Sequence, residues 1–301
     1  MGRAVKMFAG AAIVAAMTGI AAPAGGKTVT DVLGREISVD GTPLRIVSLA
    51  PNITEILFEL GLGDSVAGVT FFCDWPPEAR KIQKIGGFIN PSLESVVALE
   101  PDLVLATADG NRPGDIEALE RLGLAVFVID TRSFDDIEET VILVGELTGR
   151  GAEGKRIAEE MRRRRERVRK AVAESRAPTV FVALDHSPLI TAGEGTFVDE
   201  LITLAGGRNV VRSPAVKYPV YSLEQLFSAD PEVLLSTAPV PADAPGGGDW
   251  WSGLPGGAGL KAVRNGTVYV LGTMDFFRPG PRIVDSLERM ALILHPEVFG
   301  K

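Results

Sequence analysis

The sequence SLESVVALEPDLVLA at residues 92–106 returns in a similar form as SLEQLFSADPEVLLS at residues 222–236. In both copies a Ser-Leu-Glu start precedes a short helical pattern, which a proline ends and an apolar strand pattern follows. The copies begin 130 residues apart in a chain of 301 residues. This spacing predicts that a whole structural unit, and not only one helix and strand, is present twice.

Two further pairs of segments support the duplication. TEILFELGLGDSV at residues 54–66 resembles FVDELITLAGGRNV at residues 197–210, and AVFVIDTRSFDDI at residues 125–137 resembles TVYVLGTMDFFRP at residues 267–279. Short matches arise by chance among α/β proteins, but three pairs in the same order are harder to explain in that way. The sequence therefore predicts two similar lobes.

Short β-branched runs alternate with longer helical patterns along the chain. Seven runs, each bounded by Gly, Pro, Asp or Asn, are predicted strands: Arg45–Ala50, Val66–Thr70, Asp102–Thr107, Ala125–Asp130, Thr179–Asp185, Glu232–Thr237 and Thr267–Gly272. Strands that alternate with helices form parallel sheets covered by helices, and ligands gather at the carboxyl ends of such strands. The expected fold class is α/β.

The segment Glu153–Ser175 contains no Gly or Pro apart from Gly154 near its start, which predicts one long helix between the lobes. At 1.5 Å per residue it would span about 35 Å, enough to run along both lobes and restrict their hinge motion. Its Arg162–Arg165 cluster has glutamates at i, i+4 spacing, such as Glu160 before Arg164, which indicates an exposed strut and not a nucleic-acid site. The expected division of the chain is an N-terminal lobe at 25–150, the connecting helix at 151–177 and a C-terminal lobe at 178–301.

Residues 1–24 are typical of an export signal. Arg3 and Lys6 form a short basic region, Met7–Ala21 is an uncharged apolar run, and Ala22–Ala24 offers small residues for cleavage before Gly25. An uncleaved anchor is the alternative, but two glycines and a threonine make the run less apolar than a spanning helix of ~20 residues requires. No cysteine follows the run, so no lipid anchor is expected. We expect an exported, soluble, periplasmic protein.

Composition argues against several classes of function. A net charge of −8 does not suit a general nucleic-acid binder, whose surface is basic. One cysteine (Cys73) and two histidines (His186 and His295) are too few for a structural zinc site or a disulfide framework. The expected partners are small molecules or proteins, and no metal or cofactor of the protein's own is expected.

Large aromatic residues gather in loops that also carry polar groups. Examples are Phe71–Pro77, Phe88–Pro91, Lys217–Pro219 and Asp275–Arg278. Aromatic rings beside a few oriented polar groups are what a bulky ligand requires. The alternative is that each ring only seals a loop onto the core, but four such loops in two lobes favour a cleft.

These features resemble the substrate-binding proteins of ABC importers for cobalamin, siderophores and haem. The resemblance rests on RIVSLAPNITEILFELG at 45–61, DWPP at 74–77, the repeated Ser-Leu-Glu segments, TAGEGTFVDELITLAGG at 191–207 and RNGTVYVL at 264–271. It implies two α/β lobes joined by one long helix, with the ligand cleft between the lobes. Within the family, DWPPEARKI and TMDFFRPGPRI look most like the cobalamin-binding members.

The resemblance also implies which residues bind the ligand. Trp75, Phe88 and Tyr218 match ring positions of the corrinoid site, although Phe88 and Tyr218 replace expected tryptophans, and Asp275 matches a polar contact. The expected ligand-binding set is Trp75, Phe88, Tyr218, Asp275, Phe276, Arg278 and Arg282. Cobalamin or a related corrinoid is the first expected cargo, and an iron-siderophore complex or haem is the second.

Glu94 and Glu224 are each the third residue of a Ser-Leu-Glu helix start. A carboxylate there complements the helix dipole and need do nothing more. The resemblance implies in addition that one surface glutamate per lobe docks against arginines of the membrane permease. The duplicated placement suits a two-fold transporter, so we expect a monomer that docks through both glutamates.

An exported hydrolase is the alternative from another functional class. Gly63-Asp64-Ser65 resembles the nucleophile block of one esterase class, but His295 lies in Ile-Leu-His-Pro and no Asp-x-x-His partner accompanies it. His186 follows a predicted strand and is a candidate ligand for the metal of a bound cargo, although a hydrogen-bonding role is commoner for such a histidine. Cys73 is interpreted as a small loop residue. We expect a binding protein and not an enzyme.

Overall fold

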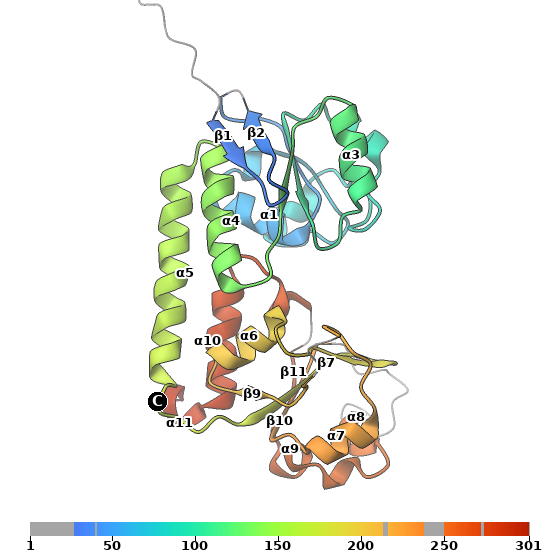
Figure 1. The fold of residues 1–301 in the computed structure, drawn as a ribbon, viewed down its shortest axis with the longest axis vertical. Helices are drawn as coiled ribbons and strands as arrows, with labels where there is room; N and C mark the ends of the chain where they lie inside the picture. Colours follow the sequence, from blue (N-terminus) through green and yellow to red (C-terminus); the bar gives the residue numbers. More distant parts are fainter. Residues whose placement is uncertain (1–26, 40, 213–215, 238–249, 272–273, 301) are drawn as a thin grey trace, which may run out of the picture.

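A computed structural model describes residues 27–39, 41–212, 216–237, 250–271 and 274–300. It has two α/β lobes, one at each end of the long helix α5 (Gly151–Ala171) (Figure 1). The predicted export signal at residues 1–24 lies outside the described residues.

The N-terminal lobe is built on a four-stranded parallel sheet with strand order β4-β3-β5-β6. Its strands are short and almost wholly buried, because helices cover both faces and β-branched residues then fill both sides of the sheet. The elements of this lobe are β1 (Lys27–Thr30), β2 (Glu36–Val39), β3 (Ile46–Ser48), α1 (Pro51–Glu59), η1 (Gly63–Ser65), β4 (Val66–Val69), η2 (Pro77–Lys81), α2 (Leu93–Ala98), β5 (Leu103–Thr107), α3 (Pro113–Arg121), β6 (Val126–Ile129) and α4 (Phe134–Leu147).

The C-terminal lobe repeats this arrangement. Its parallel strands have the order β9-β7-β10-β11, and β8 pairs antiparallel with the end of β7 on the same side as β9. The elements of this lobe are β7 (Thr179–His186), β8 (Leu189–Thr191), α6 (Phe197–Leu204), β9 (Arg208–Asn209), α7 (Leu223–Ala229), β10 (Val233–Ser236), α8 (Trp250–Gly253), η3 (Gly257–Gly259), α9 (Lys261–Asn265), β11 (Val268–Val270), η4 (Met274–Phe277), α10 (Ile283–Leu294) and α11 (Pro296–Phe299).

The α/β class and the two similar lobes predicted from the sequence are confirmed. Each of the seven predicted strand segments overlaps an observed strand, and matching segments of the repeat occupy matching places in the two sheets. The prediction missed the β1–β2 hairpin and strands β8 and β9. β8 and β9 span three and two residues, which is too short for a periodic pattern to show.

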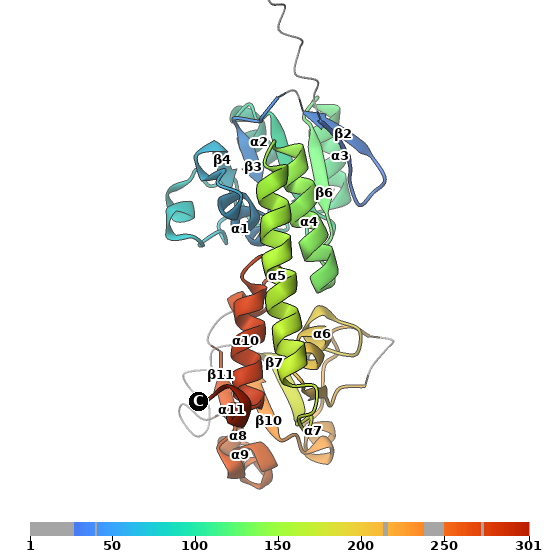
Figure 2. The same cartoon turned by 90° about the vertical axis from the view of Figure 1, so that its left-hand side faces the viewer.

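Helix α5 differs in two ways from the predicted strut. It ends at Ala171 and not at Ser175, because the chain turns at Val172, which is buried against Gly206 of the C-terminal lobe. Its arginines also bind neighbouring helices. Arg162 donates to Glu138 of α4, whereas Arg164 donates to Glu288 and Asp285 of α10 and so does not form the predicted pair with Glu160. Figure 2 shows α5 lying across both lobes, beside α4 in one and α10 in the other.

A second set of contacts joins the lobes directly, at the start of α4 and α6. The rings of Phe134 and Phe197 stack with centroids 5.6 Å apart, and the backbone N–H of Phe134 donates to the Glu200 carboxylate over 3.0 Å. The lobes therefore meet along α5 and along this seam, and the cleft lies between them.

Candidate ligand-binding cleft

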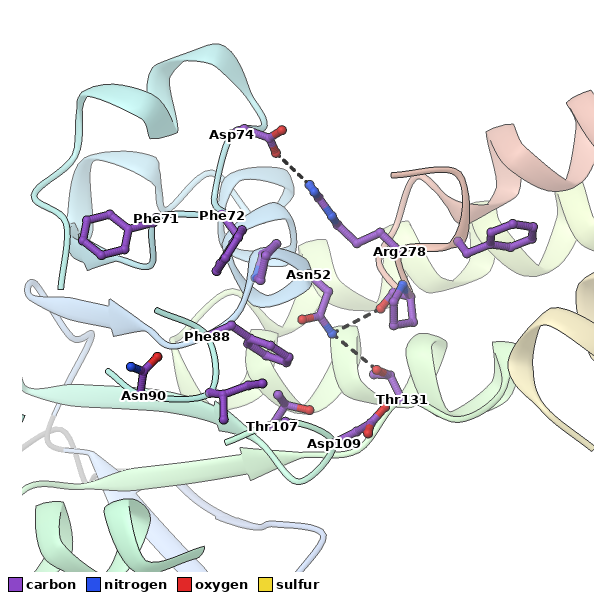
Figure 3. A pocket seen from close by; sticks show the side chains of 15 residues that line it. Asn52, Phe71, Phe72, Asp74, Phe88, Asn90, Thr107, Asp109, Thr131 and Arg278 are labelled. Atoms are coloured by element: carbon purple, nitrogen blue, oxygen red, sulfur yellow. Dashed lines mark hydrogen bonds and ion pairs between the residues drawn. The ribbon is translucent and has the colours of Figure 1, made fainter. Parts of the chain in front are cut away.

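A cleft of about 920 Å³ opens where the carboxyl ends of the N-terminal strands face the C-terminal lobe. Figure 3 shows its lining side chains converging from loops of the N-terminal lobe and from the segment before α10. The lining residues are Pro51, Asn52, Phe71, Phe72, Asp74, Phe88, Ile89, Asn90, Thr107, Asp109, Gly110, Thr131, Phe277, Arg278 and Pro279. Its size suits a bulky organic ligand, since ligand pockets typically measure roughly 300–1,000 Å³.

The loop after β4 presents two exposed phenylalanines, Phe71 and Phe72, at 65% and 60% exposure. The loop is held from behind. Lys84 donates to the carbonyls of Cys73 and Ala79 over 3.1 and 3.2 Å, and Arg80 donates to the carbonyl of Asp74. The backbone is thus fixed while two apolar rings face solvent. An exposed apolar surface of this kind is typical of a binding site for an apolar partner.

Phe88 lies on the backbone of Gly110, and a side chain at position 110 would overlap its ring: a Cβ added there would stand 2.1 Å from Phe88 Cζ. Gly110 also has a φ of +133°, which favours glycine. Buried Asn111 fixes the loop from below, since its amide donates to the carbonyl of Phe88 over 2.7 Å and its Oδ1 accepts from the Thr107 N–H. The Phe88 ring is therefore a preorganised part of the cleft.

A charged cluster closes one end of the cleft. Arg278 donates to Asp74 and to Glu55, over 3.0 and 2.8 Å, and Arg282 donates to both oxygens of the Glu55 carboxylate. The Glu55 side chain is only 1% exposed. A carboxylate so deeply buried destabilises the fold unless cations and hydrogen-bond donors pair with it, and the two arginines supply both. The cluster joins α1 of one lobe to the segment before α10 of the other.

Trp75 belongs to this cluster and not to the cleft lining. The Arg282 guanidinium lies 4.4 Å from the centroid of its ring, a cation–π contact. The predicted ligand residues Trp75 and Arg282 thus contact each other, whereas Arg278 and Phe88 line the cleft.

The remaining predicted ligand residues are distributed around the cleft. Phe276 is buried against Phe277, which is the residue that lines the cleft. The side chain of Asp275 lies outside the described part of the structure. Tyr218 of the C-terminal lobe is 52% exposed and is not a lining residue. Burial, and then the nearby charge of Asp109, raise the pKa of the Tyr218 phenol, so Tyr218 lies opposite an acidic residue of the other lobe.

Several lining residues were not singled out in the sequence. Asn52 donates to Thr131 Oγ1 and to the carbonyl of Pro279, over 3.3 and 3.4 Å, and so spans the two lobes at the cleft floor (Figure 3). Asn52 and Thr131 lie within the conspicuous segments 45–61 and 125–137, but nothing in those segments marks them individually as lining residues, and Asp109 lies in no such segment. Their position just after a strand pattern is the signal that could have indicated all three.

Glu94 and Glu224 both lie in the first turn of their helices, α2 and α7. In each helix the preceding serine caps the backbone: Ser92 Oγ accepts from the Ser95 N–H and Ser222 Oγ accepts from the Gln225 N–H. Because the serines cap the helices, the carboxylates of Glu94 and Glu224 are not needed as caps. The two glutamates occupy equivalent positions in the two lobes.

His186 and Cys73 are buried and do not line the cleft. His186 Nε2 lies 2.8 Å from Ser236 Oγ, and its ring packs against Trp250 with centroids 4.6 Å apart. Burial lowers the pKa of His186, so the neutral imidazole is favoured. Cys73 is 1% exposed, and its Sγ lies 3.2 Å from Thr70 Oγ1.

The two residues of the hydrolase hypothesis do not form a pair. Ser65 ends η1 in the N-terminal lobe, whereas His295 is buried in the C-terminal lobe beside the Gly206 carbonyl. This arrangement gives the hydrolase hypothesis no support.

The described residues hold neither a metal cluster nor a helix that could span a membrane. Across these residues no three His, Cys, Asp or Glu side chains are grouped so as to hold a metal ion. None of the helices within the described ranges combines the length and apolar character needed to cross a membrane.

The chain is similar to known binding proteins in sequence. It is 30% identical over 250 residues to the vitamin B12-binding protein of Vibrio cholerae, a match that covers 83% of this chain and 88% of that protein. It is 28% identical over 280 residues to an ABC transporter substrate-binding lipoprotein of Bacillus subtilis, covering 90% of this chain and 86% of that one.

Solved structures show the same fold. The periplasmic vitamin B12-binding protein of V. cholerae matches with a TM-score of 0.75 at 30% identity, over 84% of this chain and 97% of that chain. A periplasmic haem-binding protein from Roseiflexus sp. RS-1 matches with a TM-score of 0.76 at 27% identity, over 86% of this chain and 100% of that chain. The resemblance to importer binding proteins is thereby confirmed. The periplasmic binding protein family model matches residues 46–273, and this chain belongs to that family.

Proposed function

We propose that this protein captures cobalamin, or a related corrinoid, in the periplasm and delivers it to the permease of an ABC importer. The observation that carries the proposal is the character of the cleft. Its walls are flat aromatic rings, at Phe71, Phe72 and Phe88, and polar groups such as Asn90 and Asp109 stand at its edges. A corrinoid is a broad, partly apolar ring system fringed with amides, so it matches both features.

The charges of the cleft favour a corrinoid over an anionic iron chelate. Strong recognition of carboxylates usually requires bidentate arginines, but the Arg278 guanidinium is engaged by Glu55 and Asp74. The ammonium of Lys217, in the C-terminal lobe, donates to the carbonyl of Gly195 over 2.9 Å. Asp109 adds negative charge at the cleft lining, which would repel an anionic ligand.

Haem is the second candidate, because haem-binding proteins share the fold. Ferric haem is held by a neutral histidine or a tyrosinate in many proteins. His186 is buried away from the cleft lining, and burial, together with the Asp109 charge, raises the pKa of the Tyr218 phenol and so opposes its ionisation. Both facts argue against the described residues as axial ligands.

Calorimetry on the mature chain would test the proposal. We expect cyanocobalamin to bind one to one, with haemin and a ferric hydroxamate siderophore binding at least about a hundredfold more weakly, a difference of about 2.7 kcal/mol. Saturable binding of haemin or the siderophore without any heat from corrinoids would overturn the choice of ligand. Native mass spectrometry of protein purified from its own periplasm would weigh a retained ligand directly.

We further propose that residues 1–24 are removed on export and that the mature protein carries no lipid anchor. The proposed units are an N-terminal lobe at 25–150, the connecting segment at 151–177 and a C-terminal lobe at 178–301. The mature protein acts as a monomer whose lobes move little, because α5 and the Glu55 cluster both join them. Scattering profiles with and without ligand should then nearly superimpose, and a large compaction would contradict the proposal.

A further inference from the structure

The Asp109 carboxylate differs from the other charged groups of the cleft. Asp74 and Arg278 bind each other, and Arg278 also binds Glu55. Among the described residues that line the cleft, Asp109 is the one charged side chain without a hydrogen bond or ion pair to another described residue. It is exposed in the loop after β5, directly before Gly110, on which Phe88 rests.

The surroundings of Asp109 supply no cation to balance it within the described part of the chain. Burial, and then the charge of Asp109, raise the pKa of the Tyr218 phenol in the opposite lobe, so this neighbour is neutral at physiological pH. The Lys217 ammonium beside Tyr218 donates to backbone carbonyls at Glu194 and Gly195. Asp109 is therefore a carboxylate acceptor at the edge of an aromatic cleft, where N–H groups of a bound ligand can take the place of its hydrating water.

We propose that Asp109 is a specificity-determining residue, which accepts N–H groups from the rim of the ligand and disfavours a carboxylate at that place. The inference rests on the proposed function, because it assumes a corrinoid lying against the aromatic walls. An amide N–H donated to a carboxylate forms a charge-assisted hydrogen bond, about twice as strong as a neutral one. A ligand carboxylate in the same position would instead meet a like charge.

Derivatives of cyanocobalamin provide the probe. In each of its three monocarboxylic acids one peripheral propionamide is replaced by a propionate, and the rest of the molecule is unchanged. Affinities of all four compounds would be measured by calorimetry at pH 7.5 for the wild-type protein and for Asp109→Asn. We expect at least one acid to bind the wild-type protein about 10- to 100-fold more weakly than cyanocobalamin. Asp109→Asn should bring that ratio to within about threefold, because an asparagine accepts and donates without charge.

Asp64→Asn is the matched control, since Asp64 lies on η1, before the amino end of β4 and away from the cleft lining. It removes the same charge and should leave the ratio unchanged. Equal binding of cyanocobalamin and all three acids by the wild-type protein would overturn the inference, as would a ratio that Asp109→Asn does not alter. In both cases cyanocobalamin still binds, so the proposed function stands. If no corrinoid binds the wild-type protein, the proposed function is wrong and the inference falls with it.

Discussion

The two lobes share one strand order but contribute unequally to the cleft. The N-terminal lobe lines it from the ends of β3, β4, β5 and β6, whereas the C-terminal lobe adds Phe277, Arg278 and Pro279. This contribution depends on one connection. Four residues, 130–133, join β6 to α4, but twelve residues, 271–282, join β11 to α10 in the equivalent place. The two sheets are alike whereas their loops differ, so that the N-terminal lobe forms most of the cleft wall and the C-terminal lobe contributes one side through a single long loop.

The largest effect is expected where the lobes are most alike, at the helix starts of Glu94 and Glu224. Glu94→Lys together with Glu224→Lys should abolish ligand uptake by cells and leave the dissociation constant unchanged, because a docking contact becomes repulsive. The single variants should each reduce uptake to a similar degree. Glu117→Lys, on the exposed face of α3, is the control. Normal uptake by the double variant would contradict the docking role.

The next largest effect concerns the Glu55 cluster, which joins the two lobes at one end of the cleft. Arg278→Ala together with Arg282→Ala leaves the buried Glu55 carboxylate without either arginine, which should lower the free energy of unfolding by about 3–5 kcal/mol. Urea unfolding followed by circular dichroism would measure this. Arg163→Ala, which removes an exposed pair with Glu160 on α5, should cost less than about 1 kcal/mol. Equal losses in the two variants would show that the cluster does not stabilise the joint.

A smaller effect should distinguish the wall from the rim of the opposite lobe. Phe72→Ala removes an exposed ring of the wall and should weaken corrinoid binding by about 1–3 kcal/mol without affecting folding. Val220→Ala removes a side chain of the C-terminal lobe that is similarly exposed, at 65%, but does not line the cleft. It should change the affinity by less than about 0.5 kcal/mol. Calorimetry on both variants checks this. A larger loss of affinity in Val220→Ala than in Phe72→Ala would show that the ligand does not bind against the Phe72 wall.

The smallest effect is an acid sensitivity of the C-terminal lobe. Because burial lowers the pKa of His186, the unfolded chain binds the proton more tightly, and stability should fall as the pH drops below about 6.5, the unfolded value. Between pH 7.5 and 5.5 the wild-type protein should lose about 1 kcal/mol more than His186→Asn, as measured by urea unfolding at each pH. The same pH dependence in both proteins would exclude His186 as the cause.

Much of the fold could be predicted from the sequence because its signals are local. A buried parallel strand such as Leu103–Thr107 is a run of apolar and β-branched residues, and the serine caps of α2 and α7 lie within the repeated motif itself. The end of α5 could not be predicted in the same way, since Val172 turns there to pack against Gly206, far along the chain.

The site was harder to predict because its residues are selected by contacts between distant segments. Trp75 and Arg282 are both predicted ligand residues, but nothing local in the sequence indicates that they lie against each other across the two lobes. Glu55 lies within an ordinary amphipathic helix pattern. Its burial to 1% exposure is explained by its ion pairs with Arg278 and Arg282, which are more than 200 residues away in the sequence. Asp109 and Asn111 have no motif, yet one faces the cleft and the other makes three hydrogen bonds below it.

The burial of Cys73 has a practical consequence for following the ligand in solution. It is the single cysteine of the sequence, and its side chain is buried although it belongs to the same loop as the exposed Phe71 and Phe72. Thiol-reactive dyes should therefore not label Cys73 in the folded protein. A cysteine introduced at exposed Ile89, on the cleft edge, would be labelled alone and would place an environment-sensitive fluorophore beside the aromatic wall. Because α5 and the Glu55 cluster hold the lobes together, such a local reporter suits this protein better than a pair of dyes that senses the distance between lobes.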